Sequence, residues 1–303
     1  MRICSLLPSA TEMLFALGLG DRVVGVSHEC DFPAAARGLR VLTRCAFDSS
    51  NLTQGQIDGA VRELARSGKS LYEIDDEALG EANPDLIVTQ DLCHVCAITP
   101  AEVDRATARL ANKPEVISLN PSTIEDVFND MMRIADAAGV AGLPVVEPLQ
   151  ARVKAIAPLS LAPAKPTVGC VEWLEPLWRT GHWVPEMVQL AGGDEVLAAL
   201  GKPSRPLEWA ELQDRDPEIL VMMPCGCDLI RTREAFSRVR ERYPWEDLKA
   251  FRDNRFYLVD ANSYFSRPGP RLVEGLELLA ELIHPEYFSS SAPLQSYVAI
   301  SSN

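Results

Sequence analysis

The sequence predicts an α/β fold of two lobes, each built on a mostly parallel sheet. Strand-like and helix-like segments alternate along both halves of the 303-residue chain, a pattern typical of parallel sheets with crossover helices. The segment "EANPDLIVTQDLC" in the first half is echoed by "DRDPEILVMMPCGC" in the second. A strand-free helical stretch separates the halves. We therefore expect a first lobe at 1–121, a helical linker at 122–164, a second lobe at 165–288 and a polar tail at 289–303.

In the first lobe, short apolar runs predict the strands and capped amphipathic runs predict the helices. The opening helix has Ser9 or Thr11 as a candidate N-cap, and Gly18 and Gly20 mark its end. The expected strands are "RICSLL", "RVVGVS", "RVLT", "SLYEI", "DLIVTQ" and "EVISL". The expected helices are "TEMLFALGLG", "TQGQIDGAVRELARSG", "DDEALGEAN" and "PAEVDRATARLAN".

The linker and the second lobe follow the same rules. Apolar residues at helical spacing from Ile124 to Ile134, preceded by Ser122 or Thr123 as N-cap, predict the first linker helix. The second linker helix is "LPVVEPLQARVKAIAPL". The second lobe contains the strands "TVGCV", "EILVMMP" and "RFYLVD" and the helices "VPEMVQLAGG", "TREAFSRVRERY" and "PRLVEGLELLAELI". Trp209 and Trp245 are expected to pack on the surface of this lobe, and the tail to be loosely held.

Composition and charge exclude several classes of function. The formal net charge is −14 and the pI is near 4.8, so the chain repels phosphate backbones and anionic lipid. No apolar window is long enough for a transmembrane helix. Pro8, Ser9, Thr11 and Glu12 interrupt the apolar run at the N-terminus, which does not fit a signal peptide. We expect a cytoplasmic protein, or a periplasmic one if a leader has been removed.

Cysteines, histidines and aromatic residues gather in loops that follow the predicted strands. In a parallel sheet these loops meet at one edge, where ligands bind. They bring the candidate residues His28, Glu29, Cys30, Cys45, Gln90, Cys93, Cys96, Trp173, Cys225, Cys227, Tyr264, Phe265 and Arg267. His182 and Trp183 lie in a loop that could either contact a ligand or anchor itself. We expect both lobes to direct such groups into one cleft.

The "CHVC" segment, Cys93 to Cys96, has three interpretations. It could be half of a metal site that binds zinc or an iron–sulfur cluster, completed in space by Cys30, by Cys45, or by Cys225 and Cys227. It could be a dithiol redox pair, although such motifs occur in domains much smaller than this chain. It could also be a packed turn without chemistry.

Together, these motifs resemble the periplasmic-binding-protein family that captures cobalamin and ferric siderophores, in particular its leaderless cobalamin-binding branch. The resemblance is carried by "RICSLLPSATEMLFALGLGDRVVGVSHECDFP", "SLYEIDDEALGEANPDLIVTQDLCHVCAI", "EWLEPLWRTGHWVPEMVQLAGG", "PEILVMMPCGCDL" and "SYFSRPGPRLVEGLELL". It implies two Rossmann-like lobes joined by a rigid helix, with the ligand held between them. It also implies that Glu29 replaces a first-lobe aromatic contact, and that Tyr264, Phe265 and Arg267 face the ligand.

The resemblance favours a non-enzymatic binding protein for a cobalamin-like corrinoid or another metal chelate. The predicted contacts are His28, Glu29, Gln90, Trp173, Trp183, Tyr264, Phe265 and Arg267. Transport members of the family place a glutamate after an Asn-Leu pair to dock on an ABC permease, whereas Thr53 follows Asn51-Leu52 here. The alternative is a cysteine-ligated metalloprotein, which could be an enzyme. No serine elbow, phosphate loop or zinc-protease helix supports the common enzyme classes.

Overall fold

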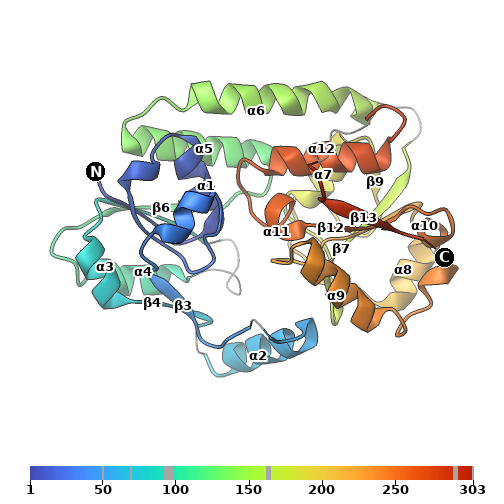
Figure 1. Ribbon diagram of the computed structural model, residues 1–303, viewed down its shortest axis with the longest axis horizontal. Helices are drawn as coiled ribbons and strands as arrows, with labels where there is room; N and C mark the ends of the chain where they lie inside the picture. The colour runs from blue at the N-terminus through green and yellow to red at the C-terminus, as the bar shows by residue number, and fades with distance from the viewer. Residues whose placement is uncertain (50, 69, 92–97, 162–164, 289–292, 302–303) are drawn as a thin grey trace. The chain divides into compact units, whose positions relative to one another are not determined.

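A computed structural model describes residues 1–49, 51–68, 70–91, 98–161, 165–288 and 293–301. The chain divides into two compact units (Figure 1). The first contains residues 1–52, 56–121 and 125–147, and the second contains 53–55, 122–124 and 148–303. No helix in the described ranges is both long and apolar enough to cross a membrane.

The first unit is built on a parallel sheet with the strand order β2-β1-β5-β6. A separate antiparallel pair, β3 and β4, lies outside this sheet. Among the described residues, the predicted strand "RVLT" therefore joins the main sheet through one isolated bridge, between Val26 and Val41. The elements are β1 (Ile3–Ser5), α1 (Pro8–Ala16), β2 (Val23–Val26), β3 (Thr43–Cys45), α2 (Gln54–Arg66), β4 (Tyr72–Ile74), α3 (Asp76–Ala82), β5 (Leu86–Gln90), α4 (Pro100–Thr107), β6 (Glu115–Leu119) and α5 (Ile124–Ala138).

The division between the units falls inside one of the predicted linker helices. This helix, α6, runs from Leu143 to Ile156, and the boundary lies between Glu147 and Pro148. Pro148 has no backbone N–H and cannot bond to the carbonyl one turn earlier, so the helix is locally weakened at that position.

The second unit has a mixed sheet with the order β10-β8-β7-β11-β12-β13, and β9 pairs with β7. Strands β7, β11 and β12 are parallel, whereas β8, β10 and β13 run antiparallel to their neighbours. The elements are β7 (Thr167–Leu174), β8 (Leu177–Arg179), α7 (Val184–Leu190), β9 (Asp194–Glu195), β10 (Arg205–Pro206), α8 (Trp209–Arg215), β11 (Ile219–Met222), α9 (Leu229–Val239), α10 (Lys249–Arg252), β12 (Phe256–Val259), α11 (Ala261–Tyr264), α12 (Leu272–Ile283) and β13 (Tyr297–Ile300).

The sequence echo between the halves is a real structural repeat. Helix α3 ends at Asn83 and helix α8 ends at Asp216, both in the left-handed conformation with φ of 40° and 35°. Each is followed by a proline, and then by an inner strand of its unit's sheet, β5 or β11. Asn and Asp tolerate this conformation because their short polar side chains can bond locally. The repeated unit is therefore helix, left-handed cap, proline and buried strand.

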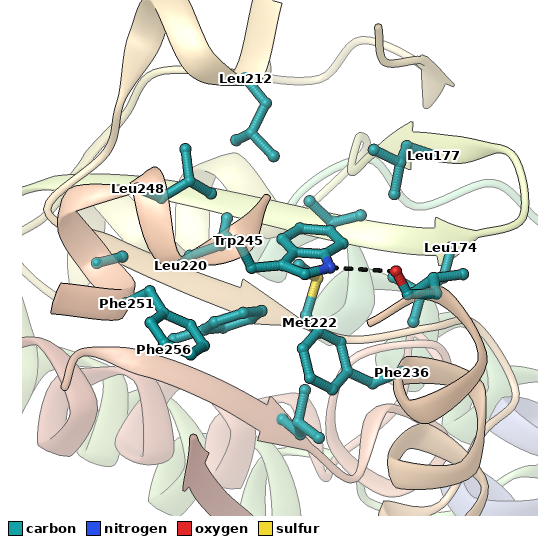
Figure 2. Close-up of a cluster of buried hydrophobic side chains, with 14 of the residues drawn as sticks. Leu174, Leu177, Leu212, Leu220, Met222, Phe236, Trp245, Leu248, Phe251 and Phe256 are labelled. Atoms are coloured by element: carbon teal, nitrogen blue, oxygen red, sulfur yellow. Dashed lines mark hydrogen bonds between the residues drawn. The ribbon is translucent and has the colours of Figure 1, made fainter. Parts of the chain in front are cut away.

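Trp245 does not pack on the surface as expected, because it forms the centre of the second unit's core. It is 1% exposed and its ring lies 4.9 Å from that of Trp209 and 5.6 Å from that of Phe236. Its indole N–H donates to the Val239 carbonyl at 3.2 Å (Figure 2). A buried tryptophan needs such an acceptor, since an unpaired N–H in a core is costly.

The tail is also more ordered than expected. Residues Tyr297–Ile300 form β13, which pairs antiparallel with β12 along its full length. The "YVAI" segment contains aromatic and β-branched residues that favour a strand. The prediction of a loose tail was based on the serines of 289–303 and overlooked this short apolar run.

Gly275 allows helix α12 to approach α11 closely. A Cβ at this position would lie 2.2 Å from the Tyr264 carbonyl oxygen and 3.1 Å from the Met187 side chain. The Tyr264 backbone cannot move aside as a flexible side chain can. Position 275 therefore requires glycine. This contact fixes the start of the loop that carries Phe265 and Arg267.

We expect Gly275→Ala to destabilise the protein by about 1–3 kcal/mol, because the added methyl forces α12 away from α11. Gly80→Ala is the matched control. Gly80 is also helical, but its Cβ would meet nothing within 4 Å. There the better helix propensity of alanine should stabilise by up to about 1 kcal/mol. Denaturant unfolding measures both, and equal effects would contradict the close approach.

Glu195 is a buried carboxyl at the end of β9. Its Oε1 accepts hydrogen bonds from the backbone N–H groups of Leu197 at 2.8 Å and Ala198 at 3.2 Å. Burial raises the pKa of Glu195 to about 7, although hydrogen bonds from Leu197, Cys170 and Ala198 oppose this shift. The folded state therefore holds a proton at a pH where the unfolded chain has released it.

The stability contributed by this proton is fully present below pH 4.5, the ordinary value, and is lost as the pH rises to about 7. We expect the free energy of unfolding to fall by about 3 kcal/mol across that window because of this group. Glu195→Gln should remove that part of the slope, while Glu241→Gln, which removes an exposed carboxyl, should not. Urea unfolding at pH 5 and pH 8 checks this, and an unchanged slope in Glu195→Gln would refute it.

Candidate functional site

In the first unit, the candidate residues follow the carboxyl ends of β2 and β5. His28, Glu29 and Cys30 come directly after β2, and Gln90 is the last residue of β5. Gln90 is buried. Cys93, His94 and Cys96 lie outside the described residues. The predicted loops thus begin at the same edge of the parallel sheet.

His28 rests on the β3–β4 pair. Its Nδ1 lies 2.7 Å from Thr43 Oγ1, and its ring centroid lies 5.3 Å from that of Tyr72. Tyr72 in turn donates its hydroxyl to Glu29 Oε1 at 3.2 Å. Partial burial lowers the pKa of His28, and this effect outweighs the negative charge of Glu29, which raises the pKa. The neutral imidazole is therefore favoured. His28 and Glu29 remain exposed while two neighbouring side chains hold them in place.

The alternation along β3 and β4 explains this placement. Thr43 pairs with Ile74 and Cys45 pairs with Tyr72, so these four side chains share one face of the pair. Arg44 and Glu73 lie on the other face, where they form an ion pair at 2.8 Å. The face toward His28 therefore offers a hydroxyl, a thiol and an aromatic ring.

Cys30 has a structural environment. It is buried, and its sulfur accepts a hydrogen bond from Thr11 Oγ1 at 3.0 Å. The Thr11 hydroxyl also lies 2.8 Å from Ser5 Oγ. This contact ties the loop after β2 to the start of α1.

In the second unit, Gln54 joins the end of β7 to the loop after β11. This residue begins α2 but belongs to the second unit. Its Oε1 accepts from the Leu174 N–H at 2.8 Å, and its Nε2 donates to Cys227 Sγ at 3.6 Å. Gln54 is buried. Half-buried Trp173 lies on the same strand end, with its indole N–H bonded to the Glu175 carbonyl at 3.1 Å.

The two cysteines of the "PCGC" loop differ from each other. Cys225 is exposed, and its N–H bonds to the Glu172 carbonyl at 2.9 Å. Cys227 is buried, and burial raises the pKa of its thiol to about 11. Gly226, with a φ of 71°, supplies the left-handed conformation between them. Only Cys225 is therefore accessible to a ligand in solution.

The loop after β12 carries the remaining candidates. Tyr264 and Arg267 are half-buried, whereas Phe265 is 3% exposed. Burial raises the pKa of Tyr264, so its phenol stays protonated. Trp183 is also buried and donates its indole N–H to the Phe265 carbonyl at 2.8 Å. Trp183 therefore anchors this loop, and Tyr264 is the more accessible aromatic group in it.

A thiolate metal centre has no support among the described residues. The described part of the chain contains no group of three or more His, Cys, Asp or Glu side chains able to hold a metal ion. A metal would need the thiolate of Cys227, but the raised pKa of this thiol favours its protonated form. The sulfur of Cys30 already accepts a hydrogen bond from Thr11. Because Cys93 and Cys96 fall outside the described ranges, their part in such a centre stays a prediction.

Three positioning residues were not found from the sequence: Thr43, Tyr72 and Gln54. Tyr72 and Thr43 lie in short runs whose pairing the sequence does not reveal. Gln54 lies more than a hundred residues from its partners Leu174 and Cys227. Of the three, only Gln54 stands at a distinctive place in the sequence, the start of a predicted helix. That place indicates a helix cap rather than a long-range contact.

Comparisons with known proteins agree with this architecture. The sequence profile of a family described as periplasmic binding protein matches residues 3–263. An uncharacterized ABC transporter substrate-binding lipoprotein of Bacillus subtilis, YvrC, is 25% identical over 299 residues, which cover 95% of this chain and 81% of the relative.

Two solved structures have the same fold. The periplasmic vitamin B12 binding protein BtuF of Vibrio cholerae superposes with a TM-score of 0.68 at 17% identity, covering 95% of this chain and 98% of that one. The periplasmic heme-binding protein RhuT from Roseiflexus sp. RS-1 gives 0.69 at 21% identity, covering 94% and 98%. The predicted α/β fold is thereby confirmed. Since the profile spans most of the sequence, the chain belongs to the periplasmic binding protein family.

Proposed function

We propose that the protein is a non-enzymatic binding protein for a planar metal chelate of the corrinoid or heme type. The observation that carries this proposal is the set of aromatic and polar side chains at the strand ends of each unit. His28 and Tyr72 supply it in the first unit, and Trp173 and Tyr264 in the second. Aromatic faces bind planar ligands by stacking, and a few polar groups fix their orientation.

Two relatives of the same fold bind ligands of this kind, since one is a vitamin B12 binding protein and the other a heme-binding protein. Metal chelates of this size present large apolar faces with polar edges. Binding such a ligand depends on aromatic rings that are accessible for stacking rather than on many charged groups. Trp173 and Tyr264 are half-buried and therefore accessible. A permease partner, suggested by the ABC transporter description of the Bacillus relative, stays a prediction.

Titration of the purified protein with cyanocobalamin, hemin and a ferric hydroxamate siderophore tests the proposal. We expect saturable quenching of tryptophan fluorescence by at least one of the first two, because Trp173 lies at a strand end. Tyr264→Ala should weaken that binding roughly 10-fold, since loss of one stacking ring removes about 1.4 kcal/mol. Tyr287→Ala is the control, because Tyr287 is an exposed tyrosine of the same unit. If neither cyanocobalamin nor hemin quenches the fluorescence, the proposed function is wrong, whether or not the siderophore does.

We also propose a cytoplasmic location. Five cysteines of the described residues are free thiols: Cys4, Cys45, Cys170, Cys225 and Cys227. Free thiols persist in a reducing compartment, whereas oxidising compartments favour disulfides. Fractionation of cells that express the full gene product should place the protein with cytoplasmic markers. Release with the periplasmic fraction would contradict this proposal.

A further inference from the structure

We propose that His28 binds the metal of the chelate through Nε2 as an axial ligand, and that Thr43 is the residue that orients it. This inference rests on the proposed function and narrows it. It limits the cargo to planar chelates that have an exchangeable axial position on the metal. A coordinatively saturated siderophore would gain nothing from His28.

The first step is the direction of the imidazole. The two ring nitrogens point in different directions, and Nδ1 is bound to Thr43 Oγ1 at 2.7 Å. Thr43 is buried, while His28 is exposed. The bound nitrogen therefore faces the protein, and Nε2 faces outward. Among the described residues, the structure shows no hydrogen bond to Nε2.

The second step is the tautomer. Thr43 Oγ1 accepts the backbone N–H of His28 at 3.1 Å and lies 3.2 Å from Ser27 Oγ, to which it can donate its single proton. With that proton directed to Ser27, the Thr43 oxygen accepts Nδ1–H from the ring. The lone pair of the imidazole is then on Nε2, as metal binding requires. Metal-ligating histidines in general donate their other ring N–H to a neighbouring oxygen in this way.

The third step is the rigidity of the ring. Tyr72 packs against His28 with the planes inclined by 48°, and the Tyr72 hydroxyl is in turn held by Glu29. Thr43 and Tyr72 come from paired strands and share one face of the pair, so one rigid element fixes the ring at two points. A preoriented ligand loses little rotational entropy when the metal binds.

The fourth step is the chemistry of the exchange. A water molecule on the chelated iron or cobalt leaves, and the Nε2 lone pair forms the new bond to the metal. The metal keeps its oxidation state and no co-reactant is needed. A bare metal ion would need more ligands than His28 offers, and the described residues form no group of three or more metal-binding side chains. The macrocycle must therefore supply the remaining ligands.

The test uses the full chain with hemin and with a corrinoid, cobinamide, in its diaqua and dicyano forms. Wild-type protein should shift the visible bands of hemin toward those of an imidazole complex, and should prefer diaqua over dicyano cobinamide at least 10-fold. His28→Ala should lose both the shift and the preference. Excess imidazole should restore the hemin bands in that variant.

Thr43→Val is the test of orientation, because valine keeps the shape of threonine without its hydroxyl. We expect hemin to bind roughly 10-fold more weakly to this variant, with the imidazole-type bands retained at saturation. Thr107→Val is the matched control. Thr107 donates its hydroxyl to the Val103 carbonyl at 2.9 Å within α4 and should leave binding unchanged.

Several outcomes would overturn the inference. If hemin quenches tryptophan fluorescence but His28→Ala gives the same spectrum as wild type, the axial role is refuted while the proposed function stands. If Thr43→Val binds like Thr107→Val, the orienting role is refuted. If hemin and cobinamide do not bind to wild-type protein but cyanocobalamin does, the inference fails alone. If none of the three binds, both the inference and the proposed function fail.

Discussion

The parallel arrangement of the strands is the constraint on which the rest of the structure depends. Parallel neighbours such as β1, β2 and β5 must all end at the same edge of the sheet, and the chain must return through a crossover after each one. Every segment that follows a strand is therefore brought to one edge, however far apart the segments are in the sequence. The same holds for β7, β11 and β12 in the second unit. Polar and aromatic residues that follow the strands of one sheet therefore become neighbours through the strand arrangement alone.

This constraint also explains which parts of the fold could be predicted. Apolar runs such as "DLIVTQ" and "EILVMMP" form strands that are buried on both faces, and they are readable from the sequence alone. The left-handed caps before them became evident only in the structure. Strands β8, β9 and β10 were not predicted, because "LWR", "DE" and "RP" contain no apolar run and no alternation of strand length. Trp245 was misplaced because its neighbours Pro244 and Glu246 are exposed, and burial of one residue in such a turn depends on tertiary packing.

The site was predicted in part for the same reason. His28, Glu29 and Tyr264 follow strands and Trp173 is near the end of one, so their position in the sequence indicated their place at the sheet edge. The side chains that orient them could not be found in this way. Thr43 acts through a strand pair outside the main sheet, and Gln54 through hydrogen bonds to residues 120 and 173 positions away. Hydrogen-bond partners at such separations are set by the three-dimensional fold, and a single sequence carries no local signal for them.

Strand β13 has a consequence for the solubility of the protein. It pairs with every residue of β12, from Phe256 to Val259, which is otherwise the last strand on that side of the sheet. The four β12 residues are almost fully buried, and their backbone donors and acceptors on that side are satisfied by β13. A chain shortened before Tyr297 would present a flat, apolar edge strand to other molecules. Edge strands of that kind recruit strands from neighbouring copies, so the last residues of this chain protect it from aggregation.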